Sequence, residues 1–177
     1  MSAASSPGLA ARLRGVALGA VVALAAAPGL AEEFKAGDLT IDDPWSRATP
    51  KGADVAAGYL VLHNRGATPD RLLGGAADFA EEVSVHEMSM DAGVMKMRAL
   101  PSGLEIPPGG EVRLAPSGFH IMFTGLKRQL KKGEGLPVAL TFERAGKVAV
   151  VFHVEGVGAS GPGGAAKPAD GMKGMKM

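Results

Sequence analysis

After residue 31, hydrophobic residues recur in short runs that glycine, proline or aspartate interrupt every few positions. The runs are rich in branched and aromatic side chains and show little helical period, which is the pattern of β-strands. Helical turns are expected only near residues 78–82 and 126–130. The expected strands are residues 39–41, 57–63, 82–88, 94–98, 104–106, 111–114, 120–123, 136–142 and 148–154.

Glycine and proline clusters separate these runs and are typical of tight turns. They fall at residues 91–93, 107–110, 116–118 and 145–146. Many short strands joined by such turns predict a single antiparallel β-sandwich or barrel. We therefore expect one all-β domain over residues 32–156.

The two ends of the chain differ from this pattern. Arg12 and Arg14 precede a thirteen-residue apolar run and then small residues up to Ala31, the order of a cleaved secretory signal at residues 1–31. The run is shorter than the roughly 20 residues of a membrane-spanning helix, although an uncleaved anchor is the alternative. Residues 157–177 are rich in glycine, alanine and lysine, which predicts a flexible tail.

Charge and cysteine content narrow the possible functions. Without residues 1–31, lysine and arginine fall from 19 to 17 against 18 acidic residues, a formal charge of −1. A near-neutral chain gives no electrostatic reason to expect nucleic acid or anionic lipid as a partner. The chain has no cysteine, so any soft metal ligand must be a methionine thioether.

Methionines provide the strongest chemical signal, because after the initiator they fall in only two zones. Met172, Met175 and Met177 end the tail, and the others lie at positions 88, 90, 95, 97 and 122. Methionines that only fill gaps in a core would be scattered among the strands. The clustering therefore indicates a function other than packing.

Two histidines lie in the same zone, each two residues before a methionine. His86 precedes Met88 and His120 precedes Met122. Residues i and i+2 of a strand share a face, so each pair presents an imidazole beside a thioether. Met90 extends the first set, and the turn at residues 91–93 brings the methionines of the next run, Met95 and Met97, back beside it.

Imidazole suits several metals, but thioether sulfur is soft and selects Cu(I) over Zn²⁺, Mg²⁺ or Ca²⁺. The alternative is a purely structural role, in which the methionines pack in the core and the histidines are isolated polar residues. His63 and His153 have no methionine two residues away and are expected to be structural. No nucleophile with a neighbouring base stands in a catalytic motif, so we do not expect an enzyme.

Residues 38–154 resemble the PCuAC family of copper chaperones. The resembling stretches are residues 44–50, 57–64, 85–91, 93–97, 103–107, 118–122 and, more weakly, 125–128. The resemblance implies a cupredoxin-like Greek-key β-sandwich that binds one Cu(I) through His86, Met97, His120 and Met122. Met88 and Met90 rank as alternate ligands, and the tail methionines as a weak second site.

The resemblance also implies a role. A monomeric periplasmic metallochaperone would deliver Cu(I) by ligand exchange for cytochrome c oxidase assembly, to the oxidase copper centre or to a Sco-type protein. The alternative is a periplasmic protein that sequesters copper for resistance or storage. A blue-copper electron carrier is disfavoured because it would need a cysteine thiolate, and a β-sandwich that binds only a protein partner remains a third possibility.

Overall fold

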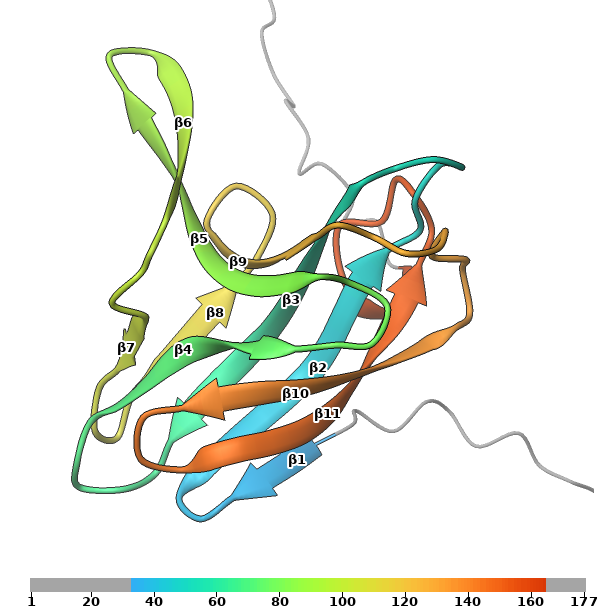
Figure 1. Ribbon diagram of the computed structural model, residues 1–177. Coiled ribbons are helices and arrows are strands. Elements are labelled where there is room, and N and C mark those ends of the chain that lie inside the picture. The colour runs from blue at the N-terminus through green and yellow to red at the C-terminus, as the bar shows by residue number, and fades with distance from the viewer. Residues whose placement is uncertain (1–32, 165–177) are drawn as a thin grey trace, which may run out of the picture.

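The computed structural model describes residues 33–164, and Figure 1 shows that they fold as strands joined by turns. The described residues contain no α-helix and only one short 3₁₀ turn, η1 (Pro162–Gly164). The predicted all-β domain is therefore confirmed. The strands are β1 (Glu33–Ala36), β2 (Leu39–Arg47), β3 (Val55–Asn64), β4 (Asp70–Ala76), β5 (Glu82–Asp91), β6 (Val94–Ala99), β7 (Leu104–Ile106), β8 (Glu111–Leu114), β9 (Phe119–Thr124), β10 (Gly135–Phe142) and β11 (Gly146–Glu155).

The strands pair into a sheet that closes on itself. The order runs from β2 through β11, β10, β4, β5, β9 and β3, and β3 pairs again with β2. The β2–β11 pairing is parallel, and the other pairings are antiparallel. Closure leaves few open edges, and β1, β6, β7 and β8 extend it at β2, β5, β4 and β3.

The core lies inside this closed sheet and follows from the alternation of the strands. In β10 and β11 every second residue is buried, as the period of two requires. Three aromatic rings pack edge to face at its centre, with Phe123 5.1 Å from Phe79 and 5.7 Å from Phe152 between centroids. Gly58 is the neighbour of these rings, because a Cβ there would lie 2.9 Å from both Phe123 and Phe152.

Strand β4 was not among the expected strands, and its sequence contains two consecutive glycines, which are uncommon within strands. In the structure Gly75 pairs with Val83 of β5 and lies against β10. A Cβ on Gly75 would lie 2.6 Å from the carbonyl oxygen of Ala139. The glycines therefore allow three strands to approach closely where the sheet closes.

The expected helical turns near residues 78–82 and 126–130 are wrong. Neither segment is helical: residues 78–79 form one turn, in which the amide of Ala80 donates to the carbonyl of Ala77 at 3.4 Å, and the segments otherwise bond to each other and to other parts of the domain. The amide of Lys127 donates to the carbonyl of Phe79, and the amide of Glu81 donates to that of Thr124, each at 2.9 Å. These long-range bonds satisfy the backbone that a local helix would otherwise have satisfied.

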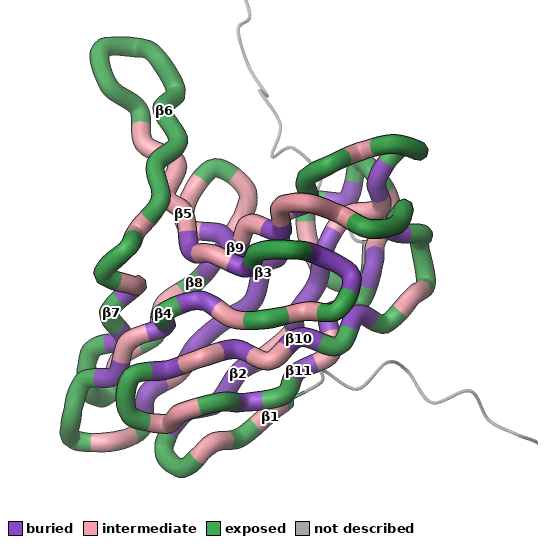
Figure 2. Tube along the Cα trace, viewed as in Figure 1, coloured by how far each residue is buried: buried purple, intermediate pink, exposed green. Residues whose placement is uncertain are grey.

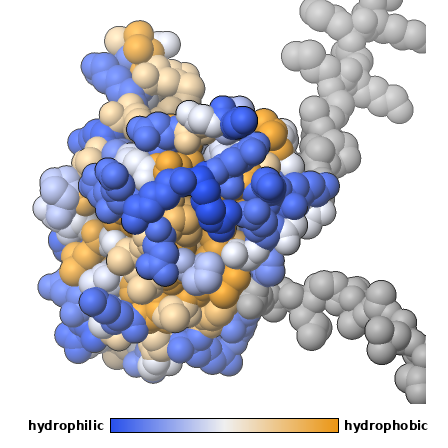
Figure 3. All heavy atoms as spheres, turned by 45° about the vertical axis from the view of Figure 1, so that its right-hand side comes forward, coloured by the Kyte–Doolittle hydropathy of each residue, from blue (hydrophilic) through white to orange (hydrophobic). Residues whose placement is uncertain are grey.

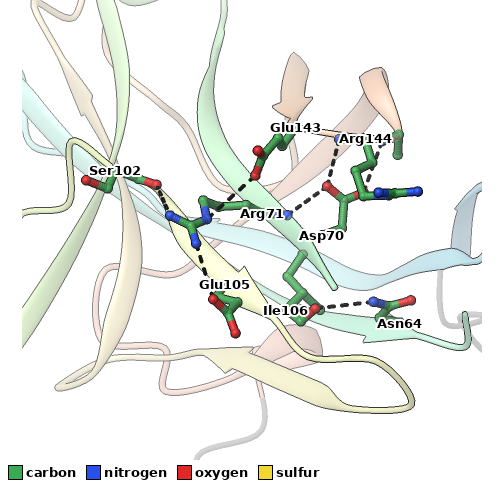
Figure 4. A network of polar contacts seen from close by, with 9 residues as sticks. Asn64, Asp70, Arg71, Ser102, Glu105, Ile106, Glu143 and Arg144 are labelled. Atoms are coloured by element: carbon green, nitrogen blue, oxygen red, sulfur yellow. Dashed lines mark hydrogen bonds and ion pairs between the residues drawn. The ribbon is translucent and has the colours of Figure 1, made fainter. Parts of the chain in front are cut away.

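At the end of the fold away from the β5–β6 hairpin, a buried carboxylate holds one turn in place (Figures 1 and 4). Asp70 accepts hydrogen bonds from the amides of Arg71, Arg144 and Ala145 at 2.7–3.0 Å. The Arg71 side chain reaches two carboxylates, Glu105 on β7 at 3.2 Å and Glu143 in the β10–β11 turn at 3.7 Å. This network joins β4 to β7 and to the β10–β11 turn.

The described structure continues past the expected domain end at residue 156. Ala159 is buried against Trp45 and Tyr59, and its carbonyl accepts a 2.7 Å hydrogen bond from Arg47 Nε. The segment leading to residue 164 therefore packs on the domain. The expected signal at residues 1–31 and the tail methionines at positions 172, 175 and 177 lie outside the described residues. No helix between residues 33 and 164 has the length and hydrophobicity needed to cross a bilayer.

Candidate metal centre

The β5–β6 hairpin forms an arm that projects from the domain (Figure 1). Its turn is Ala92-Gly93, where φ is +48° and +80°, the two left-handed residues that a tight hairpin turn needs. The register pairs Met88 with Met97 and Met90 with Met95. The methionines of the second run therefore return beside those of the first, as the turn sequence predicted.

On its other side, β5 pairs with β9, and this pairing places the two histidine motifs next to each other. His86 lies opposite His120, and Ser84 lies opposite Met122. Directly opposed residues of antiparallel strands point to the same face. Since Ile121 lies in the core between His120 and Met122, both of these side chains point to the outer face.

A cavity of about 560 Å³ opens on this outer face. The candidate ligands that line it are His120 and four methionines, namely Met88, Met95, Met97 and Met122. Its remaining wall comes mainly from β2, β3 and the loops beside them, and includes Arg47, Tyr59, Val55 and Val157. Soft sulfur donors and an imidazole thus share one apolar-lined opening.

Two predicted residues lie outside the lining. Met90 is 70% exposed near the tip of the arm. His86 lies next to His120, with ring centroids 5.8 Å apart and the rings tilted by 36°. Two imidazoles on opposite sides of one ion would have centroids roughly 6 Å apart, because each nitrogen lies about 2 Å from the metal. The spacing of His86 and His120 therefore suits a shared ion.

His120 is held in a defined orientation. The ring is buried, and its Nδ1 lies 3.1 Å from the carbonyl oxygen of Gly118. A carbonyl only accepts, so Nδ1 carries the proton and Nε2 keeps its lone pair. Metal-binding histidines are commonly oriented in this way, by a hydrogen bond from the ring nitrogen that does not bind the metal.

His86 is oriented by its neighbour on the strand. Its Nε2 lies 3.1 Å from Ser84 Oγ, while Nδ1 is buried and has no hydrogen-bond partner among residues 33–164. A proton on Nε2, donated to Ser84, leaves a lone pair on Nδ1 that a metal ion would satisfy. Desolvation, with a smaller contribution from the nearby His120, lowers the pKa of His86, so the ring stays neutral and able to bind.

The donor set favours a soft cation. In the part of the chain that the structure describes, no three His, Cys, Asp or Glu side chains form a group that could hold a metal ion. The candidate ligands are instead two imidazoles and several thioethers, all neutral. Thioethers bind Cu(I) in preference to hard divalent cations.

Ser84 and Arg47 were not singled out from the sequence. Ser84 stands two residues before His86, and the same spacing rule that joined His86 to Met88 could have identified it. Arg47 lies 6.0 Å from the ring centroid of Trp45 and 5.8 Å from that of Tyr59, at the wall of the cavity. Only the folded arrangement brings it there.

The remaining histidines lie away from the cavity. His63 on β3 is paired with Asp42 at 3.1 Å and with Glu111 at 3.6 Å. His153 on β11 lies opposite Trp45. Both positions agree with the expected structural roles.

Comparison with known proteins gives a consistent set of relatives. The family described as "Putative lipoprotein LpqE-like" matches residues 39–154. The "Putative lipoprotein Lxx21020" of Leifsonia xyli subsp. xyli (strain CTCB07) is 32% identical over 108 residues, which cover 61% of this chain and 64% of that protein. The chain thus matches slightly less than two thirds of this relative.

Solved structures of similar proteins include copper-bound forms. The copper-bound PCuAC domain from PmoF2 is 28% identical, with a TM-score of 0.61 over 71% of this chain and 98% of that domain. The CuI form of DR1885 from Deinococcus radiodurans is 29% identical, with a TM-score of 0.53 over 63% of this chain and 74% of that one. With a family match over most of the domain and these structural neighbours, the chain belongs to the LpqE-like family, which is the PCuAC family.

Proposed function

We propose that this protein binds Cu(I) in the cavity between β5, β6 and β9 and passes it to a partner protein. The observation that carries the proposal is that His120 and four methionines, from segments far apart in the sequence, line one cavity. The similar structures described as copper-bound PmoF2 and CuI-DR1885 support copper as the cargo and Cu(I) as its oxidation state.

The proposed ligands are His86, Met97, His120 and Met122. The two histidines supply the oriented nitrogens, because Ser84 and the Gly118 carbonyl hold their rings. Met88 lines the same cavity and can replace a thioether ligand during loading or release. All of these donors are neutral, so binding requires no ligand to lose a proton when the histidines are neutral.

Transfer would proceed by ligand exchange at the open side of the cavity. Met97 is 50% exposed on β6, so a thiolate or imidazole from an acceptor can replace it before the histidines are released. Because one ligand is exchanged at a time, free copper is never released into solution. The exposed Val55 and Val157 at the cavity wall provide apolar surface for an acceptor to contact.

The proposed setting is the periplasm, reached by cleavage of the signal at residues 1–31. The lipoprotein name of the Leifsonia xyli relative supports export. The acceptor proposed from the family resemblance is the copper centre of cytochrome c oxidase or a Sco-type protein, with the chaperone acting as a monomer. Met172, Met175 and Met177 are proposed as a weak additional site.

Anaerobic Cu(I) titration against a competing chelator tests this function. His120→Ala and Met97→Leu should each lower the affinity, whereas His63→Ala, which alters a histidine outside the cavity, should not. Equal affinities for all four proteins would refute the ligand assignment. Mixing the copper-loaded protein with a copper-free acceptor then separates a chaperone, which transfers the metal, from a sequestering protein, which retains it.

A further inference from the structure

We propose that the β5–β6 arm carries a second, outer Cu(I) site formed by the thioethers of Met90, Met95 and Met88. The outer site rests on the proposed function, since it takes the same cargo. It differs in having no imidazole ligand and in extending from the rim of the cavity, where Met88 and Met95 lie, towards the tip of the arm. Copper held there would enter or leave the cavity site.

The register of the hairpin brings the thioethers together. Met88 pairs with Met97 and Met90 pairs with Met95, so the four side chains form two adjacent rows on one face of the arm. The amide of Met88 bonds to Gly118 on the other side of β5, and the amide of Leu100 bonds to Val85. Both methionine pairs are therefore non-hydrogen-bonded pairs, in which opposed side chains lie closest.

A packing role does not account for these methionines. Met90, Met95 and Met97 are 70%, 52% and 50% exposed, and every residue of β6 is exposed (Figure 2). Hydrophobic residues extend to the end of the projection at the top of Figure 3. Exposed apolar surface of this kind usually serves binding rather than folding.

The opposite face of the arm is polar, and its charged side chains form ion pairs with one another. Lys96 pairs with Asp91 at 2.5 Å, and Arg98 pairs with Glu87 at 2.7 Å. The arm is therefore a two-sided ribbon with ion pairs on one face and thioethers on the other. That separation places neutral soft donors together and leaves the charged groups on the other face, an arrangement that suits Cu(I).

Met95 connects the two sites, because it lies in the outer pair and also lines the cavity. Together with Met88 and Met97 it makes a continuous row of thioethers from the cavity to Met90. Copper can pass along this row by exchanging one sulfur ligand for the next, with no change in oxidation state and no proton released. Three thioethers without an imidazole bind more weakly than the cavity set, so the gradient of affinity leads inward.

The test uses the full chain with Met172, Met175 and Met177 replaced by leucine, so that the tail contributes no thioether. Methionine methyl groups labelled with carbon-13 are followed by NMR during titration with Ag(I), a redox-inert substitute for Cu(I). The first equivalent should shift the Met97 and Met122 methyl signals. The second should shift those of Met90 and Met95.

Variants then separate the two sites. Met90→Leu changes the outer ligand that does not line the cavity, so it should weaken the second binding event strongly and leave the first unchanged. Ser89→Ala with Lys96→Ala on the polar face should change neither. His120→Ala should weaken the first and spare the second. A single binding event in the starting protein, or a second event that the Met90→Leu change does not weaken, would overturn the outer site alone. No tight binding at all in the starting protein would instead refute the proposed function.

Discussion

Replacing Asp70 should destabilise the fold strongly without altering the metal centre. Its carboxylate accepts three backbone hydrogen bonds, from Arg71, Arg144 and Ala145. Hydrogen bonds to charged groups contribute about 1.5–3 kcal/mol each. Because Arg144 is exposed and water can reach its turn, we take about 1 kcal/mol per bond, which gives about 3 kcal/mol for Asp70→Ala. Asp70→Asn keeps one acceptor oxygen but turns an amide NH₂ towards a backbone N–H, and should cost about 1–2 kcal/mol.

Urea unfolding followed by circular dichroism measures these free energies. The matched control is Asp91→Ala, which breaks an ion pair whose side chains are 62% and 61% exposed and should cost about 0.5 kcal/mol or less. The slope of the unfolding free energy with urea should stay the same in all variants. Copper affinity should also be unchanged, because Asp70 holds the β10–β11 turn, which lies away from the β5–β6 arm (Figure 1). An Asp70→Ala protein as stable as Asp91→Ala would show that the carboxylate does not hold the turn.

Three further predictions concern the site and the closure of the sheet. Ser84→Ala removes the hydrogen bond that orients His86 and should lower Cu(I) affinity by about tenfold in the chelator competition; equal affinity would contradict the orienting role. The pKa of His86 lies below its ordinary value. As the pH is lowered below about 6.5, the unfolded chain therefore binds a proton that the folded protein excludes, and the unfolding free energy should decrease. His86→Gln should remove that part of the pH dependence. Gly75→Ala forces a Cβ to within 2.6 Å of the Ala139 carbonyl and should cost about 1–3 kcal/mol in urea unfolding. A Gly156→Ala control, where nothing lies within 4 Å and φ, as at Gly75, is not in the left-handed region, measures the effect of an added methyl group without the clash.

Local spacing was sufficient to predict which side chains share a face in each half of the candidate metal centre. His86 and Met88 share a face because they are two residues apart, and the turn at residues 91–93 returns Met97 to lie opposite Met88. These are short-range consequences of strand geometry. The same geometry predicted that His120 and Met122 point in one direction.

The meeting of the two halves could not be predicted from local spacing. β5 and β9 are separated by about thirty residues, and β6, β7 and β8 lie between them in the sequence. Which strands pair depends on the burial of the whole core, for which a short sequence pattern carries no signal. Ser84, which faces Met122 and orients His86, is a different case, because its spacing of two residues from His86 could have identified it from the sequence.

Strand β4 was missed for a different reason. Gly74-Gly75 weakens the strand pattern in the sequence, but here the glycines make space for neighbouring carbonyl groups, those of Val83 and Ala139. A glycine required by close approach and a glycine required by a turn are identical in sequence. Only the positions of the neighbouring strands distinguish them.

The arrangement of the donors separates capture of copper from its release. His86 and His120 lie on paired strands of the closed sheet. One nitrogen of each ring contacts a fixed polar group, Ser84 Oγ for His86 and the Gly118 carbonyl for His120, and this contact orients the ring. Met97 lies on the exposed arm and has a flexible side chain, so it can leave the metal without disturbing the core. In the proposed site, the imidazoles would therefore determine where copper is held, and the thioethers would determine how readily a partner removes it. A variant that stiffens the arm should slow transfer more than it changes affinity, because the rigid half of the site is untouched.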